Sequence, residues 1–377
     1  MRLGATLRRV AGSLAKLGGS PPAPATPLEA PGEGPSVLLP ALGTLRAAGP
    51  VHPLPGKGFV LIGFAEVRAA LAQPQIFSSA CLAPIDAVLL GADPPAQARV
   101  RQRLARHFTP EALAVPLATI EEEAMALLAP ELDVVSGYAL PLTRAVAGAL
   151  LGLPSGDVQS LVDAFGSRFA SGIAWPDLPV AETLRGSVMY RRLREGPADA
   201  LSDAEACSLV GLLAAAASIT AERLIIRCVL ALLEEPRLLA EIRRSGGQAI
   251  ASLVEEVARL YPPEPNPVRV ATQDHRVAGV VIPAGALVYL SLAAANRDPA
   301  QFESPDALRL DRKGAHLAFG SGPHQCIGAG LGRRTAAAAV AALALPPRRL
   351  RPAEPLQEIG YRMVQGMALP ARLKVAL

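Results

Sequence analysis

Apolar residues recur at helical spacing through most of the chain, and the longest such stretch runs from Asp203 to Glu235. Its first half contains the uncharged segment ACSLVGLLAAAASITA, Ala206–Ala221. This segment is shorter than the roughly 20 residues that span a bilayer. Because apolar positions cover nearly all sides of the predicted helix, we expect it to lie buried in the centre of a large fold.

The same periodicity predicts further helices, the last of which is rich in alanine. They cover Gly63–Leu71, Ala96–Phe108, Pro110–Leu128, Pro141–Leu151, Asp157–Ser171, Pro236–Ser245, Gly246–Leu260 and Gly328–Leu345. Runs of β-branched residues between Pro and Gly predict short strands near residues 51–62 and 267–292. We therefore expect a mainly α fold with small β-sheets.

The first 36 residues differ from the rest. Met1–Leu17 has apolar residues at heptad-like spacing beside Arg and Lys, which fits either a frayed basic leader or a short amphipathic helix. Such a helix would touch a membrane surface or the protein itself. A Pro/Gly-rich linker follows. We expect residues 1–36 to be disordered and residues 37–377 to form a single domain, with no secretory signal and no transmembrane segment.

Composition limits the classes of partner. Hydrophobic residues make up 51% of the chain, enough for a large core, and the net charge is only +4. The basic residues are scattered, so nucleic acid is not an expected partner, whereas an acidic protein is. Four cysteines without CxxC pairing argue against a disulfide framework and fit a reducing, cytoplasmic location.

The segment FGSGPHQCIG, Phe319 to Gly328, places one cysteine, Cys326, among glycines, a proline and a histidine, without the further Cys and His ligands that a zinc site usually needs close by. The alanine-rich helix begins just after it, and a helix N-terminus favours thiolate over thiol. Glycines allow tight turns and the close approach of a flat molecule. A single thiolate in such a loop suits the axial position of a haem iron, because the porphyrin supplies the other four ligands.

These residues resemble the haem-binding signature of the cytochrome P450 family, matched at Phe319, Gly320, Gly322, His324, Cys326 and Gly328. In the expected order, Glu256 and Arg259 resemble the family's ExxR pair. The likeness covers roughly Leu39 to Val375 and is closest to the soluble bacterial members. It implies the P450 fold, a helical prism around a buried haem with a long central helix on the distal side.

The resemblance also implies roles for individual residues. Cys326 would be the proximal thiolate ligand of the iron of haem b, and Thr220 would help deliver protons to oxygen on the distal side. Arg101, Arg269 and His324 would pair with the haem propionates, and Gln97 stands where many relatives have His. The implied cofactor-binding residues are Gln97, Arg101, Ala216, Arg269, Phe319, Gly320, His324, Cys326 and Gly328.

Each assignment has a simpler alternative. Arg101 could belong to a solvated basic face, Arg269 could be an exposed strand residue and His324 a plain loop residue. Glu256 and Arg259 could form a surface helix pair. Thr220 could be a core residue whose hydroxyl bonds the carbonyl one turn earlier.

The chain departs from the family at two places. The residue before the distal threonine is commonly acidic but is Ile219 here, and Ala217 replaces a usual glycine. Ala307 stands where relatives carry Arg or His to complete the network of Glu256 and Arg259. We expect that network to lack a partner unless Arg297 or a backbone group substitutes.

The implied reaction is the insertion of one oxygen atom from O2 into a small, apolar organic substrate, by hydroxylation or epoxidation. Electrons would come from a ferredoxin-type donor with its reductase, docking on basic residues near Arg101–His107 and Arg333–Arg334, with Arg103 and Arg333 as the positions to test. One alternative is a non-hydroxylating haem-thiolate enzyme that performs oxidative cross-linking, peroxygenation or rearrangement. The other is a non-catalytic haem-binding or recruitment protein.

Overall fold

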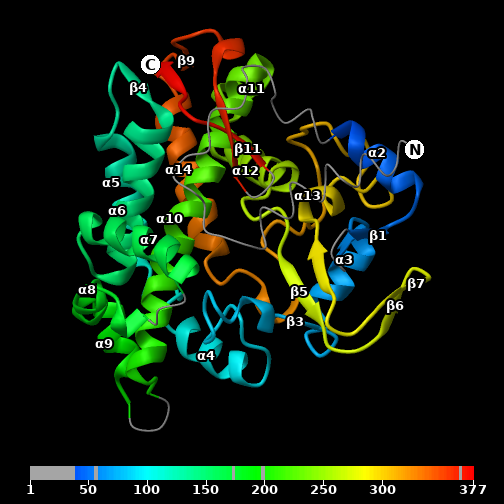
Figure 1. The fold of residues 1–377 in the computed structure, drawn as a ribbon. Helices are drawn as coiled ribbons and strands as arrows, with labels where there is room; N and C mark the ends of the chain where they lie inside the picture. Colours follow the sequence, from blue (N-terminus) through cyan, green and yellow to red (C-terminus); the bar gives the residue numbers. More distant parts are fainter. Residues whose placement is uncertain (1–38, 55–57, 172–174, 197–199, 365–366) are drawn as a thin grey trace.

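The structure, a computed structural model, describes residues 39–377 apart from 55–57, 172–174, 197–199 and 365–366. The leader and linker expected over residues 1–36 lie outside the described residues. Long helices occupy one side of the molecule and the largest sheet lies on the other (Figure 1). The predicted mainly α fold with small sheets is confirmed.

The helices fall close to the predicted ranges, although α4 ends at Ala105 rather than Phe108. They are α2 (Leu39–Ala47), α3 (Phe64–Leu71), α4 (Ala96–Ala105), α5 (Ala114–Ala126), α6 (Leu140–Leu151), α7 (Ser155–Ser171), α8 (Ala181–Gly186), α9 (Val188–Arg194), α10 (Asp203–Glu234), α11 (Pro236–Ser245), α12 (Gly247–Leu260), α13 (Leu292–Ala295) and α14 (Ala329–Ala344). The sequence prediction missed α2, α8, α9 and α13; the last three have seven residues or fewer, too few to show a clear helical period.

The largest sheet has the strand order β1-β2-β8-β5-β3, in which only β2 and β8 are parallel. Its strands are β1 (Val51–Leu54), β2 (Gly58–Leu61), β3 (Phe77–Ser78), β5 (Val268–Ala271) and β8 (Leu287–Leu290). Strands β6 (His275–Val277) and β7 (Val280–Ile282) form a hairpin. These segments confirm the strand clusters predicted near residues 51–62 and 267–292, with β3 added.

Five further strands contradict the prediction that strands are confined to those two clusters. They are β4 (Glu131–Asp133), β9 (Arg351–Pro352), β10 (Tyr361–Val364), β11 (Met367–Pro370) and β12 (Lys374–Ala376). Strand β12 pairs with β4, far away in the sequence, and with β9. Such distant pairing leaves little trace in local alternation. Strands β10 and β11 pair with each other instead.

Helix α10 is the centre of the helical side, as predicted. Its N-terminus is closed by a capping box, in which Ser202 and Glu205 each bond the other's backbone amide. Gly211 lets Trp175 pack directly on the helix, since a Cβ there would come within 2.4 Å of the indole ring. Helices α6, α7, α12 and α14 pack around it (Figure 1).

Two helical stretches of the described residues are long and apolar enough to cross a membrane by length and composition alone, Val134–Leu151 and Asp203–Glu234. Their most apolar parts are 61% and 72% buried inside the fold. That burial is what core helices show.

Candidate active site

The loop that carries Cys326 is held by its own backbone. The amide of Cys326 donates to the carbonyl of Phe319 at 2.8 Å, and the amide of Gly320 donates to the carbonyl of Leu317 at 2.8 Å. Gly320 and Gly322 both have positive φ, +71° and +69°. Gly328 is the N-cap of α14, so the thiol lies just before a helix N-terminus, as predicted.

Gly322 is also fixed by its surroundings. A Cβ there would lie 2.6 Å from the carbonyl oxygen of Leu71 and 3.0 Å from the Cα of Ala72, at the end of α3. The loop therefore docks on α3 through a position that only glycine fits.

Replacing Gly322 with Ala is expected to lower the free energy of unfolding by about 2–3 kcal/mol. Two costs add up: the strain of an alanine at positive φ, and the clash of its Cβ with the backbone at the end of α3. Gly285→Ala is the matched control, since Gly285 has φ +78° but nothing within 4 Å of an added Cβ. Chemical denaturation of both variants checks this prediction. An equal loss in the two would show that docking on α3 contributes nothing.

The electrostatics of Cys326 differ from expectation in one respect. Its side chain is solvent accessible, yet protein atoms surround it closely enough that burial raises the pKa of the thiol. The amide of Gly328 and the cations Arg101 and Arg333 act in the opposite direction without outweighing burial. The helix N-terminus alone thus does not make the thiolate; a bound metal ion would, because coordination displaces the thiol proton.

Phe319, beside this loop, is covered by a guanidinium. The Arg333 guanidinium carbon lies 4.0 Å from the centroid of the Phe319 ring. Arg333 in turn forms a bidentate pair with Glu255, at 2.7 and 3.0 Å. Burial would raise the pKa of Glu255, but hydrogen bonds from His316 and Arg333 lower it to about 2. Glu255 is thus ionised at neutral pH and holds Arg333 over the ring.

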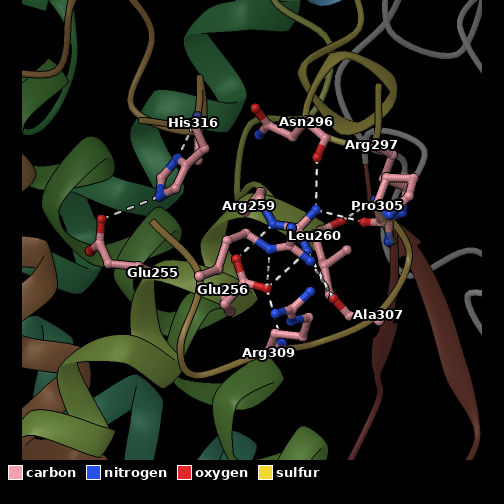
Figure 2. A network of polar contacts seen from close by, with 12 residues as sticks. Glu255, Glu256, Arg259, Leu260, Asn296, Arg297, Pro305, Ala307, Arg309 and His316 are labelled. Carbon is pink, nitrogen blue, oxygen red and sulfur yellow. Dashed lines mark hydrogen bonds and ion pairs between the residues drawn. The ribbon is translucent and has the colours of Figure 1, made fainter. Parts of the chain in front are cut away.

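Glu256 and Arg259 are not a surface pair. Their side chains are 6% and 1% exposed, and Arg259 binds both carboxylate oxygens of Glu256 at 2.7 and 2.9 Å. The remaining donors of Arg259 reach the carbonyls of Asn296, Pro305 and Ala307 at 2.6–3.0 Å (Figure 2). All five N–H groups of this buried guanidinium are satisfied.

Ala307 does not leave this network short of a partner, because backbone groups substitute, which is one of the two exceptions that the sequence analysis allowed. The side chain of Arg312, 8% exposed, donates from Nε to Glu256 at 3.0 Å, and the carbonyl of Ala307 accepts from Arg259. Arg297 instead donates to the carbonyls of Leu260 and Ala293. Sequence reasoning missed Arg312, although it lies only five residues beyond Ala307.

Asn296 connects this network to the cysteine loop. Its carbonyl accepts from Arg259, and its side-chain oxygen accepts from the amide of Leu317 at 2.7 Å. Leu317 opens the turn that leads to Phe319 and Cys326. The buried ion pair therefore sets the position of the loop through a single asparagine.

The middle of α10 contains an accessible patch in an otherwise buried helix. Ala216 is exposed, while Ala217, Ile219 and Thr220 are partly buried, and the residues before and after them are mostly buried. The hydroxyl of Thr220 donates to the carbonyl of Ala216 at 2.8 Å. A hydroxyl bonded to the carbonyl one turn earlier is what the simpler reading of Thr220 as a core residue expects. Here, however, this bond lies on the accessible side of the helix.

Arg101, Arg269 and His324 gather near the cysteine. Burial, together with the charges of Arg269 and Arg101, lowers the pKa of His324 to about 4, so its imidazole is neutral at pH 7. Nε2 of His324 lies within hydrogen-bond distance of Ser79 Oγ, at 3.1 Å. Arg269 is 5% exposed, which rules out an exposed strand residue. Arg101 makes no hydrogen bond or ion pair with another described residue.

This donor set fits a haem. It combines one accessible thiol with two arginines, and arginine is the side chain best suited to bind carboxylates such as the propionates.

Gln97 is placed differently from expectation, because it is buried and donates to the carbonyl of Pro323 at 2.8 Å, bracing the loop from α4. Phe108 lies 3.8 Å from where a Cβ of Gly328 would be.

The docking surface expected around Arg103 needs correction. Arg103 is 8% exposed and donates to the backbone carbonyls of Arg192 and Glu195. It therefore ties α4 to the end of α9 and is not available to an electron donor. Arg106 and Arg334 are exposed, and Arg333 is 40% exposed but paired with Glu255.

Comparisons with known proteins agree with this geometry. The Cytochrome P450 family model matches residues 250–343, which include the buried ion pair and the cysteine loop. Pentalenic acid synthase from Streptomyces avermitilis is 32% identical over 82% of this chain and 86% of its own. Cyclomarin C epoxidase CymV from Salinispora arenicola is 32% identical over 77% of this chain and 83% of its own.

Solved structures resemble it over nearly their whole length. Cytochrome P450 TbtJ1 matches with a TM-score of 0.81 and 26% identity over 92% of this chain and 99% of that one. P450BioI, solved with a fatty-acid-loaded acyl carrier protein, matches with a TM-score of 0.76 and 26% identity over 91% and 99%. Because these relatives are enzymes, the non-catalytic alternative is set aside. The chain belongs to the cytochrome P450 family of haem enzymes, and its reaction class is that of a P450 monooxygenase.

Proposed function

We propose that the protein holds haem b through Cys326 and uses O2 to hydroxylate or epoxidise a small, apolar organic substrate in the cytoplasm. Its electrons come from a ferredoxin-type donor with its reductase. The observation that carries the proposal is the accessible thiol of Cys326 with Arg101 and Arg269 close enough to affect the same loop.

The bound haem thiolate supplies the reductive activation of oxygen. The chain supplies the rest. Arg101 and Arg269 neutralise the propionate carboxylates, and the neutral His324 adds a hydrogen bond. Ala216, Ala217 and Ile219 present an apolar surface to the substrate on α10. The hydroxyl of Thr220 passes protons on that side.

An acidic electron donor fits the exposed arginines nearest the cysteine loop. Arg334 on α14 and Arg106 after α4 are exposed, and the pair with Glu255 holds the Arg333 guanidinium over the Phe319 ring. Opposite charges speed association and set orientation more than they raise affinity.

Reconstitution with a ferredoxin and its reductase under ¹⁸O2 tests this function. We expect the reduced protein to bind carbon monoxide with the long-wavelength Soret band of a thiolate-ligated haem, and one ¹⁸O atom per product from an apolar compound that shifts the resting Soret band. A carbon monoxide spectrum of the histidine-ligated type would refute thiolate ligation. Products without ¹⁸O would refute monooxygenation.

Ile219 favours a second candidate, a haem-thiolate enzyme that does not hydroxylate with O2. An isoleucine cannot give up a proton, so it removes the acid that commonly accompanies the distal threonine. Cross-linking, peroxygenation or rearrangement depends less on that acid. Product formed from hydrogen peroxide alone, with none formed from O2 and the donor system, would select this candidate.

A further inference from the structure

Polar residues follow Thr220 along one side of α10. Arg223, Arg227 and Glu234 come three, seven and fourteen positions after Thr220. Positions at these spacings share one side of a helix, and their side chains lean toward its N-terminus. The polar stripe so defined (Thr220, Arg223, Arg227 and Glu234) runs from the accessible middle of α10 through buried surroundings to the end of the helix.

Arg227 is the unusual member of the polar stripe. Its side chain is 0% exposed, and Nε, Nη1 and Nη2 have no hydrogen-bond partner among the described residues. The guanidinium carbon lies 3.7 Å from the centroid of the Tyr261 ring. A ring face attracts a cation but accepts few of its five N–H groups. A buried cation with unmet donors is strongly unfavourable, so a group outside the described residues must accept these bonds.

The surroundings of Arg227 suit water. Burial raises the pKa of Glu234, and Arg227 lowers it. Burial and Glu234 raise the pKa of Tyr361 on β10, and Arg227 again lowers it. Both acidic groups therefore lie within electrostatic reach of Arg227, and neither is its hydrogen-bond partner. Polar groups separated in this way are commonly bridged by buried water that makes several hydrogen bonds.

Arg223 continues the stripe between Arg227 and Thr220. It is partly buried and donates from Nη1 to the carbonyl of Pro263 at 2.8 Å. Burial lowers the pKa of Arg223, while its neighbours Glu264 and Glu222 raise it. The stretch of α10 after Thr220 is thus polar on the side that carries the catalytic hydroxyl.

We propose that Arg227 holds ordered water, and that this water, together with Arg223, forms a buried route supplying protons to the hydroxyl of Thr220 from the end of α10 at Glu234. The proton-supplying role rests on the proposed oxygen activation. The arginines stay charged and only orient the water. As Thr220 Oγ gives its hydrogen toward the distal side, the adjacent water gives one to Oγ, and solvent at Glu234 replaces the proton lost by the water.

A crystal structure of the haem-loaded protein that shows ordered water tests the first part. We expect water within hydrogen-bond distance of the Arg227 nitrogens and bridging to Glu234 or Tyr361. A guanidinium bonded only to protein groups, or to a bound anion, would overturn the proposal.

Arg227→Met tests the proton supply, with Arg244→Met as the matched control because Arg244 is exposed and bonds only Glu241 among the described residues. We expect Arg227→Met to slow turnover about tenfold or more and to raise the solvent deuterium isotope effect. Its melting temperature should not fall, since an apolar side chain replaces a buried charge.

Each other outcome is decisive. A lower melting temperature with unchanged turnover and isotope effect would show a purely structural role. If the unmodified protein makes no product, the proposed function and the supply of protons fail together, while the crystal structure still decides the water site.

Discussion

Replacing Arg259 with methionine is expected to abolish the accumulation of folded, haem-loaded protein. The substitution removes five hydrogen bonds at once and leaves the carbonyls of Asn296, Pro305 and Ala307 without their donor. It also leaves the buried Glu256 carboxylate with Arg312 as its one cationic partner among the described residues, beside the backbone amide of Arg309. Breaking one side of a buried ion pair costs about 3–5 kcal/mol, a large part of the total stability of a typical domain.

The measurement is the ratio of haem absorbance to total protein after expression, together with chemical denaturation of the purified variant. Arg309→Met is the matched control, because its side chain pairs at the surface with Asp311 and Glu303 while its backbone amide still reaches Glu256. The control should stay within about 0.5 kcal/mol of the parent. Equal stability of the two variants would show that the buried pair does not hold the cysteine loop.

Replacing Cys326 with alanine is expected to remove monooxygenation. Cys207 and Cys228 cannot take over, since they are buried within α10. Cys81 is partly exposed in the short turn Ala80–Leu82, and burial raises the pKa of its thiol, which disfavours the thiolate that a metal ligand requires. Removing a residue that only supports a metal ligand typically lowers metal affinity or activity roughly 10–100-fold. Loss of the ligand itself should therefore lower turnover by at least about 100-fold. The long-wavelength carbon monoxide band of the reduced protein should disappear at the same time.

Cys207→Ala controls for the loss of a thiol. It should keep both the band and the turnover. Retention of the thiolate-type band in Cys326→Ala would mean that another residue ligates the iron, and the assigned site would be wrong.

The cysteine loop and the Glu256–Arg259 pair were predictable because their signals are local. Gly320, Gly322 and Cys326 lie within a few residues of one another, and two charges three apart on a helix share a face. The length of α10 was predictable for a similar reason, since an apolar period that continues over so many residues has few alternatives.

Residues whose role depends on distant partners were not predictable in this way. Arg103 belongs to the same basic run as Arg101, yet it is buried against backbone carbonyls at the end of α9 while Arg101 is not. Arg312 replaces the partner missing at position 307 because the chain after α13 folds back over α12. Neither fact has a pattern in the neighbouring residues.

Local order along the chain was therefore enough to establish which segments are helices, which cysteine is set apart and which family the protein resembles. Packing decided which arginines are buried, that burial raises the pKa of the Cys326 thiol, and that the buried Arg227 guanidinium has no hydrogen-bond partner among the described residues. The reason is physical: helical period and turn chemistry act over a few residues, whereas desolvation and hydrogen-bond partners depend on segments far apart in sequence.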